Sequence, residues 1–157
     1  MTSPLSVPDV VGADRGHRVE LTLAADAQML FLARMTAAAV ASRADFEYEQ
    51  VEDLRLAIDE LCVRLMGGAP DGGRLGLLFR WDDEGVLDVT GTLIPSDVPS
   101  GNGSRSQPAV SAVSHELSER ILDALVDEHG GETLGDVHRA WLRMKRQEHS
   151  GFQEHNG

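Results

Sequence analysis

The clearest hydrophobic pattern in this chain lies between residues 51 and 66. Five apolar residues recur there at intervals of three and four positions: Val51, Leu54, Ile58, Leu61 and Leu65. That spacing lines one face of an α-helix, so it predicts an amphipathic helix. Gly67 and Gly68 follow directly, and glycines in this position commonly end a helix.

Two other segments are expected to be helical. The segment from Asp26 to Ser42 is rich in Ala, Leu and Met and contains neither Gly nor Pro, with Asp26 as its N-cap or a first-turn residue. Because it is apolar nearly all round, it is either fully buried or shares one face with a partner. The spacing of apolar residues from Leu117 to Val126 predicts another amphipathic helix.

Alternation of apolar and polar residues predicts four strands. They cover residues 19–23, 75–81, 87–93 and 140–144, and the second and third form a β-hairpin around the turn at 82–85. The order strand, helix, helix, strand, strand, loop, helix, strand packs most simply as an α/β two-layer sandwich. We expect a mixed sheet with its helices on one face.

Composition divides the chain into one domain and two tails. The 157 residues, 41% of them hydrophobic, suit a single core, which we place at residues 18–146. Residues 1–17 lack the features of a signal peptide, and residues 147–157 are polar, so both are expected to be disordered. Between them, residues 95–110 are rich in Pro, Ser, Gly and Asn and predict a mobile loop.

Charge and cysteine content narrow the classes of function. A net charge of -12 disfavours binding to nucleic acid or to an anionic membrane, and suits a basic protein partner. Cys62 is the one cysteine, so no intrachain disulfide or Cys-rich zinc site can form and a cytoplasmic setting is expected. Cys62 is interpreted as a small core residue, and the scattered histidines lack metal-ligand spacing.

The string VEDLRLAIDELCVRLM resembles the N-box helix of the RsbW-like anti-sigma serine kinases, within the histidine-kinase-like (Bergerat or GHKL) ATPases. The resemblance implies a Glu-Leu-x-x-Asn motif whose Glu is the general base and whose Asn binds the magnesium that bridges the ATP phosphates. Glu60 matches the Glu, but Arg64 stands at the Asn position, and a guanidinium cannot bind a cation. Equally, the two residues suit an ordinary surface ion pair along the helix.

The family's glycine boxes are eroded in this chain. Asp97 with Gly101 and Gly103 is either a displaced remnant of the adenine-reading box or part of an ordinary loop, and Thr90-Gly91-Thr92 is a poor substitute. The second box is replaced by residues 109–115, which contain no glycine, although glycines normally let backbone amides approach phosphates. ATP or ADP binding is therefore an open expectation, magnesium is doubtful, and kinase activity is expected to be weak or absent.

Arg34 is the one interior charge of the first predicted helix. It resembles the helix-one arginine through which family members contact their sigma factor and the competing anti-anti-sigma protein. An arginine among apolar neighbours is also typical of interface anchors. The alternative is a solvent-facing arginine whose stem covers apolar surface.

The resemblance spans residues 19–145 and implies a homodimeric anti-sigma factor with a lid-like loop at 95–110. Such a protein holds a stress or sporulation sigma factor away from RNA polymerase and is countered by a STAS-domain anti-anti-sigma protein. Two alternatives stay open. One is an active serine kinase that phosphorylates the STAS protein, with Glu60 as base; the other is a non-catalytic scaffold that regulates a different partner.

Overall fold

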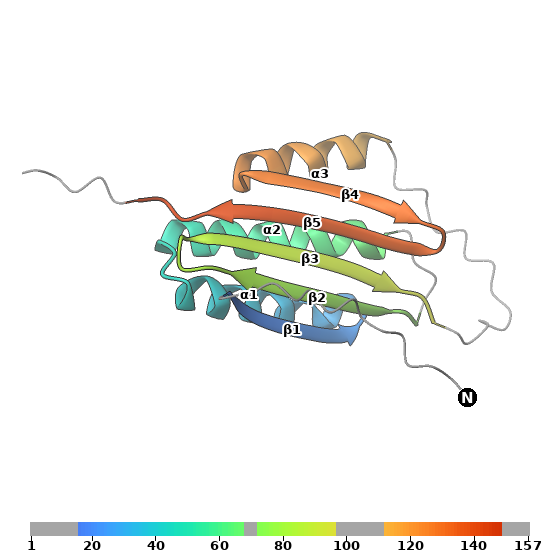
Figure 1. The fold of residues 1–157 in the computed structure, drawn as a ribbon. Helices are drawn as coiled ribbons and strands as arrows, with labels where there is room; N and C mark the ends of the chain where they lie inside the picture. Colours follow the sequence, from blue (N-terminus) through green and yellow to red (C-terminus); the bar gives the residue numbers. More distant parts are fainter. Residues whose placement is uncertain (1–15, 68–71, 97–111, 149–157) are drawn as a thin grey trace, which may run out of the picture.

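A computed structural model describes residues 16–67, 72–96 and 112–148, in which one sheet carries three α-helices on a single face (Figure 1). The elements in chain order are β1 (His17–Ala24), α1 (Leu30–Arg43), α2 (Tyr48–Met66), β2 (Arg74–Trp81), β3 (Val86–Ile94), α3 (Ala112–Leu125), β4 (Glu128–Leu134) and β5 (Val137–Lys145). The two-layer α/β sandwich is confirmed. The sheet has the order β1-β2-β3-β5-β4, and each pairing is antiparallel rather than mixed.

Strand β4 is an element that the hydrophobic pattern does not predict. It is an edge strand whose residues are exposed or half-buried, so neither of its faces requires apolar side chains. Its hairpin partner β5 supplies the pairing, and Leu134 lies opposite Val137 across a two-residue turn. Gly135 in that turn has a φ of 61°, which favours glycine. The Gly135-Asp136 dipeptide is the signal that would have indicated the hairpin.

The boundaries of the other elements differ from expectation by a few residues. Asp26 does act as a cap, because its carboxylate accepts a hydrogen bond from the amide of Gln28 at 2.9 Å. It caps a short 3-10 turn, Ala27–Met29, and α1 begins only after that turn. Helix α2 begins three residues before Val51 and has Gly67 as its C-cap. Strand β1 starts at His17, inside the expected N-terminal tail.

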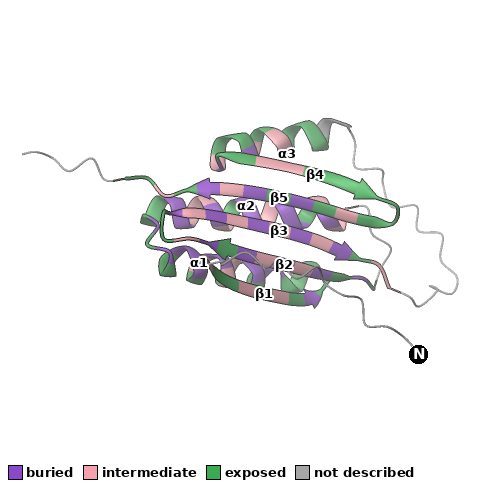
Figure 2. Cartoon of the chain, in the orientation of Figure 1, coloured by how far each residue is buried: buried purple, intermediate pink, exposed green. Residues whose placement is uncertain are grey.

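The core lies between the helices and the inner face of the sheet, where alternate strand residues are buried (Figure 2). On the sheet side, the core includes three buried residues of β2: Leu75, Leu77 and Phe79. Gly91 on β3 lets α2 approach closely, because a Cβ there would lie 2.6 Å from a methyl carbon of Leu65. Gly91 therefore has a packing role in this chain, and it allows α2 to lie against the middle strand of the sheet.

Candidate functional site

Helix α1 divides its apolar surface between the core and solvent, so the expectation of full burial is wrong and the shared face with a partner stays a prediction. Ala33, Ala37 and Ala41 are fully buried, whereas the side chains of Phe31 and Met35 are 47% and 63% exposed. These two are four positions apart and lie on the same side of the helix. Exposed aromatic and methionine side chains of this kind are typical of the centre of a protein interface.

Helix α2 also exposes apolar side chains. Leu56 and Val63 are more than half exposed and, seven residues apart, project from one side of the helix. Arg34 of α1 lies between the two helices and donates a hydrogen bond to the Asp59 carboxylate of α2 at 2.7 Å. We call the set Phe31, Arg34, Met35, Leu56, Asp59 and Val63 the outer helical surface.

The Arg34–Asp59 pair corrects the picture of a simple solvent-facing arginine. Each side chain is about one-third exposed, at 36% and 35%, and the contact joins α1 to α2. Cys62 lies nearby in the core, and burial, with a smaller contribution from the Asp59 charge, raises its pKa to about 12. The thiol is therefore protonated at neutral pH, as a core residue would be, and is a poor nucleophile.

Arg64 contacts α3 rather than Glu60, so the expected ion pair along α2 is wrong. Its Nη1 lies 2.8 Å from Oε1 of Glu119, and its Nη2 lies 3.2 Å from Nε2 of His115. Both partners are on α3, and the arginine side chain is only 21% exposed. Within the described ranges, Glu60 is half-buried and makes no ion pair. The Glu60 and Arg64 positions are thus adjacent on α2 but have separate surroundings.

The residues around Arg64 do not fit a magnesium ion. A guanidinium has only donors and a permanent positive charge, whereas magnesium requires oxygen ligands. Across the described part of the chain, no group of three His, Cys, Asp or Glu side chains could hold a metal ion. Asp97, Gly101 and Gly103 lie outside the described residues, so their assignment to an adenine-reading box stays a prediction.

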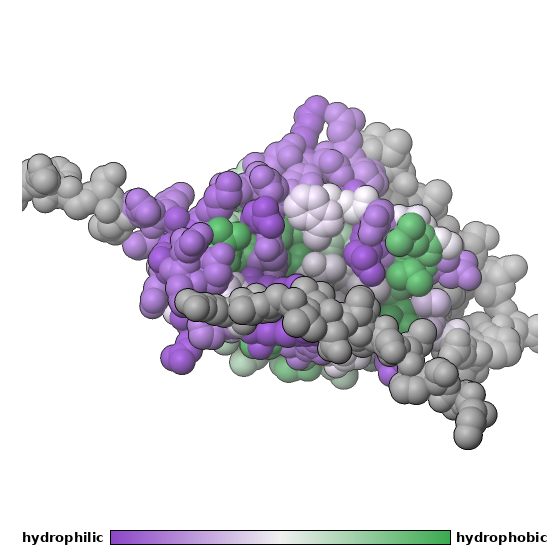
Figure 3. Space-filling view, viewed as in Figure 1, coloured by the Kyte–Doolittle hydropathy of each residue, from purple (hydrophilic) through white to green (hydrophobic). Residues whose placement is uncertain are grey.

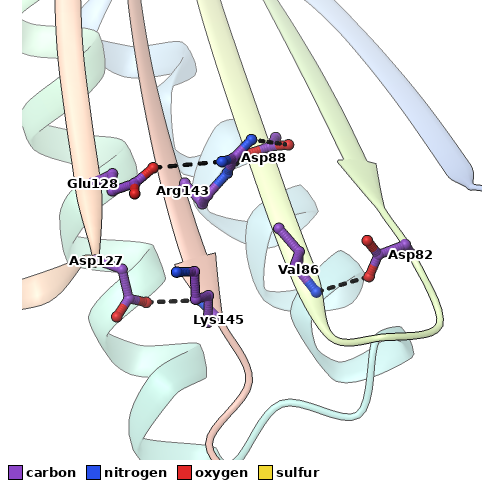
Figure 4. Close-up of polar contacts among 7 residues, drawn as sticks. All are labelled: Asp82, Val86, Asp88, Asp127, Glu128, Arg143 and Lys145. Atoms are coloured by element: carbon purple, nitrogen blue, oxygen red, sulfur yellow. Dashed lines mark hydrogen bonds and ion pairs between the residues drawn. The ribbon is translucent and has the colours of Figure 1, made fainter.

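The face of the sheet away from the helices is a second broad surface, on which hydrophilic residues are mixed with smaller hydrophobic patches (Figure 3). Arg143 of β5 donates to both carboxylate oxygens of Asp88 on β3, at 2.7 and 3.2 Å, and lies 3.5 Å from Glu128 on β4. Figure 4 shows this row of alternating charges across three strands. The Asp88 carboxylate raises the pKa of Arg143. Beside these paired charges the face also exposes apolar side chains, among them Trp141 at 38% and Leu134 at 60%.

Comparison with known proteins identifies the lineage, although no protein-family profile matches the chain. The anti-sigma-F factor RsbW of Mycobacterium tuberculosis is 34% identical over 108 residues, which cover 68% of this chain and 64% of the relative. The serine-protein kinase RsbW of Halalkalibacterium halodurans is 31% identical over 74 residues, and that of Bacillus cereus is 32% identical over 68. The chain belongs to the RsbW-like family.

This RsbW-like chain spans 64% of the length of the mycobacterial relative, and 46% and 42% of the two kinases. The names of these relatives describe both an anti-sigma factor and a kinase, so the residues of this chain must decide between binding and catalysis. No helix in the described ranges is long and apolar enough to cross a membrane.

Three contact residues of the RsbW-like chain were not indicated by the sequence. Asp59, His115 and Glu119 are ordinary surface residues in the hydrophobic pattern. Only the packing of α2 against α1 and α3 brings them to Arg34 and Arg64. No local signal could have found these pairs, because their partners lie 25, 51 and 55 positions apart in the sequence.

Proposed function

We propose that this RsbW-like chain is an anti-sigma factor that sequesters an alternative sigma factor of the stress or sporulation class. The observation that supports the proposal most strongly is the outer helical surface, where Phe31 and Met35 are exposed beside Arg34. Apolar anchors around an arginine are the composition of binding hot spots. The name of the mycobacterial relative, anti-sigma-F factor, agrees with this proposal.

Electrostatics favour a basic partner for the same surface. The net charge of -12 attracts the basic, promoter-binding regions of a sigma factor and suppresses binding to DNA itself. Asp59 holds the Arg34 side chain in one orientation, which reduces the conformational entropy that Arg34 loses when a partner binds. Arg34 therefore acts as a preorganised anchor within an apolar surface.

We further propose the remaining features that the family resemblance implies. A STAS-domain anti-anti-sigma protein would compete with the sigma factor for Arg34, the chain would act as a homodimer, and it would work in the cytoplasm. Light scattering coupled to size-exclusion chromatography tests the oligomer, since a homodimer should have twice the mass of the chain. A monomer at micromolar concentration would contradict it.

The sigma-factor proposal is tested by pull-down. The purified chain is mixed separately with each alternative sigma factor from its own cell, with the housekeeping sigma factor as a control. One or more of the alternative sigma factors should be retained and the housekeeping factor should not. Retention of none of them by the folded chain would refute the proposal and favour a scaffold for another partner.

A serine-protein kinase is the second candidate, favoured by the names of two relatives and by a Glu60 side chain free of ion pairs in the described ranges. Bound ATP would supply the phosphoryl group and Glu60 would accept the proton of the substrate serine. Arg64 counts against it because it does not fit magnesium. Labelled ATP with the STAS protein decides between the two: transfer that Glu60→Gln abolishes would establish the kinase, and no transfer would leave a binding protein.

A further inference from the structure

Arg64, His115 and Glu119 form a contact between α2 and α3 that we call the α2–α3 clasp. The guanidinium of Arg64 contacts both partners at once, at 2.8 Å from Glu119 and 3.2 Å from His115. Strand β4 lies beside the same group, since a Cβ on Gly131 would be 3.6 Å from Nη2. Arg64 is therefore enclosed by α3 and β4 and keeps only about one-fifth of its side-chain surface in solvent.

Among the described side chains of α3, the clasp lies in a part of the helix with little apolar packing. Every side chain from Ser114 to Leu117 is exposed, and Leu117 is 58% exposed. The buried apolar anchor of α3 is Leu122, near its C-terminal end. Among the described residues, His115 and Glu119 therefore join the first half of α3 to α2, whereas Leu122 packs the second half into the core.

The clasp also determines what can approach this end of α2. A phosphate group would have to compete with the Glu119 carboxylate for Arg64, and a magnesium ion would be repelled by the permanent positive charge of Arg64. The salt bridge between Arg64 and Glu119 forms within the chain and requires neither a phosphate group nor a magnesium ion. The position that binds the metal in the family resemblance is occupied here by an intramolecular contact of opposite charges.

We infer that the α2–α3 clasp holds α3 in place without nucleotide or magnesium, and that sigma-factor binding by this chain is independent of both. The second part rests on the proposed function, and the first part does not. Regulation would then depend on the concentrations of competing protein partners and not on the nucleotide state of the chain.

Amide hydrogen exchange of the purified full chain tests the first part. In EDTA, Glu119→Gln should raise the exchange rate in residues 114–125 by about fivefold, the effect of losing one partly enclosed ion pair of about 1 kcal/mol. Glu116→Gln is the matched control, because Glu116 pairs with Arg120 on the same helix with both side chains more than two-thirds exposed. Adding ATP or ADP with magnesium to the wild-type chain should leave the exchange of α3 unchanged.

Two results would contradict the inference that the α2–α3 clasp holds α3 in place. Equal exchange in Glu119→Gln and Glu116→Gln would show that the contact does not hold α3. More than about fivefold protection of α3 by magnesium and nucleotide would show that a ligand holds it instead. Arg64→Gln offers an independent check, since it removes the contact from the α2 side and should reproduce the Glu119→Gln pattern.

The Kd for the retained sigma factor tests the second part. It should agree within about twofold in EDTA, in magnesium with ADP, and in magnesium with ATP, since twofold is only about 0.4 kcal/mol. A tenfold change with nucleotide would refute independence while leaving the anti-sigma function intact. Absence of binding in all three conditions would refute the proposed function and would leave the hydrogen-exchange result to stand for the clasp by itself.

Discussion

Helix α2 has two helical neighbours that are attached in different ways. Helix α1 packs through small, fully buried residues such as Ala33 and Ala37, which allow close approach to α2. Among its described side chains, helix α3 has one fully buried apolar residue, Leu122, and the α2–α3 clasp. Each side also has one arginine–carboxylate pair, but Arg34 lies in an exposed apolar surface and Arg64 is enclosed. The same type of contact therefore lies within an exposed apolar surface in one place and is enclosed between packed elements in the other.

The largest expected effect is on the free energy of unfolding, and it compares the packing of α2 against α1 with the packing of α3. Ile58→Ala on the fully buried side of α2 should lower the free energy of unfolding by about 2–5 kcal/mol, because the close packing leaves a cavity. Leu122→Ala should fall at the low end of that range, since α3 can shift to fill the space. Denaturant unfolding measures both. A greater cost for Leu122→Ala than for Ile58→Ala would show that α3 is as tightly packed as α1.

Arg34→Ala should weaken sigma-factor binding by about 2 kcal/mol, the loss typical of an interface hot spot. Titration calorimetry with the sigma factor measures it. Arg120→Ala is the control, since Arg120 is an exposed arginine on α3 that pairs within its own helix, and it should bind normally. If both variants bind like the wild type, Arg34 is not an anchor and the outer helical surface loses its assigned role.

Cys62 makes the folded state sensitive to alkaline pH. Its pKa is about 12 in the fold, against 9.0 ordinarily, so above pH 9 the unfolded chain loses this proton and the folded chain keeps it. Stability should therefore fall between pH 9 and 12, by about 1.4 kcal/mol for each pH unit in the middle of that range. Unfolding measured from pH 8 to 11 should show a shallower decline for Cys62→Ala. Parallel declines would contradict the assigned burial of the thiol.

The smallest effect concerns the clasp itself. A double-mutant cycle with Arg64→Gln and Glu119→Gln should give a coupling energy of about 0.5–1 kcal/mol, because Glu119 is partly solvated. The Glu116–Arg120 cycle should give less, as both of its side chains are well exposed. Thermal or denaturant unfolding provides the values. Equal coupling in the two cycles would remove the distinction between an enclosed contact and a surface contact.

The fold could be predicted wherever burial imposes a period on the sequence. Strands β1, β2, β3 and β5 and helices α2 and α3 each bury one face against the core, so their apolar residues alternate or recur at helical spacing. The hydrophobic pattern does not predict strand β4, because this edge strand is stabilised by backbone pairing with β5. The antiparallel pairing of β3 with β5 was likewise hidden, since alternation within a strand does not specify its neighbour.

The sequence likewise predicts one part of the candidate site, and the tertiary structure is needed for the other part. The sequence alone determined the helix that carries Glu60 and Arg64, the replacement of a metal-binding side chain by a guanidinium, and an apolar helix with Arg34 in its interior. Only the tertiary structure decided that Arg34 contacts Asp59 and that Arg64 contacts Glu119 and His115 instead of Glu60. The physical reason is range: helical periodicity follows from local geometry, whereas ion pairs between helices depend on how distant segments pack around a shared core.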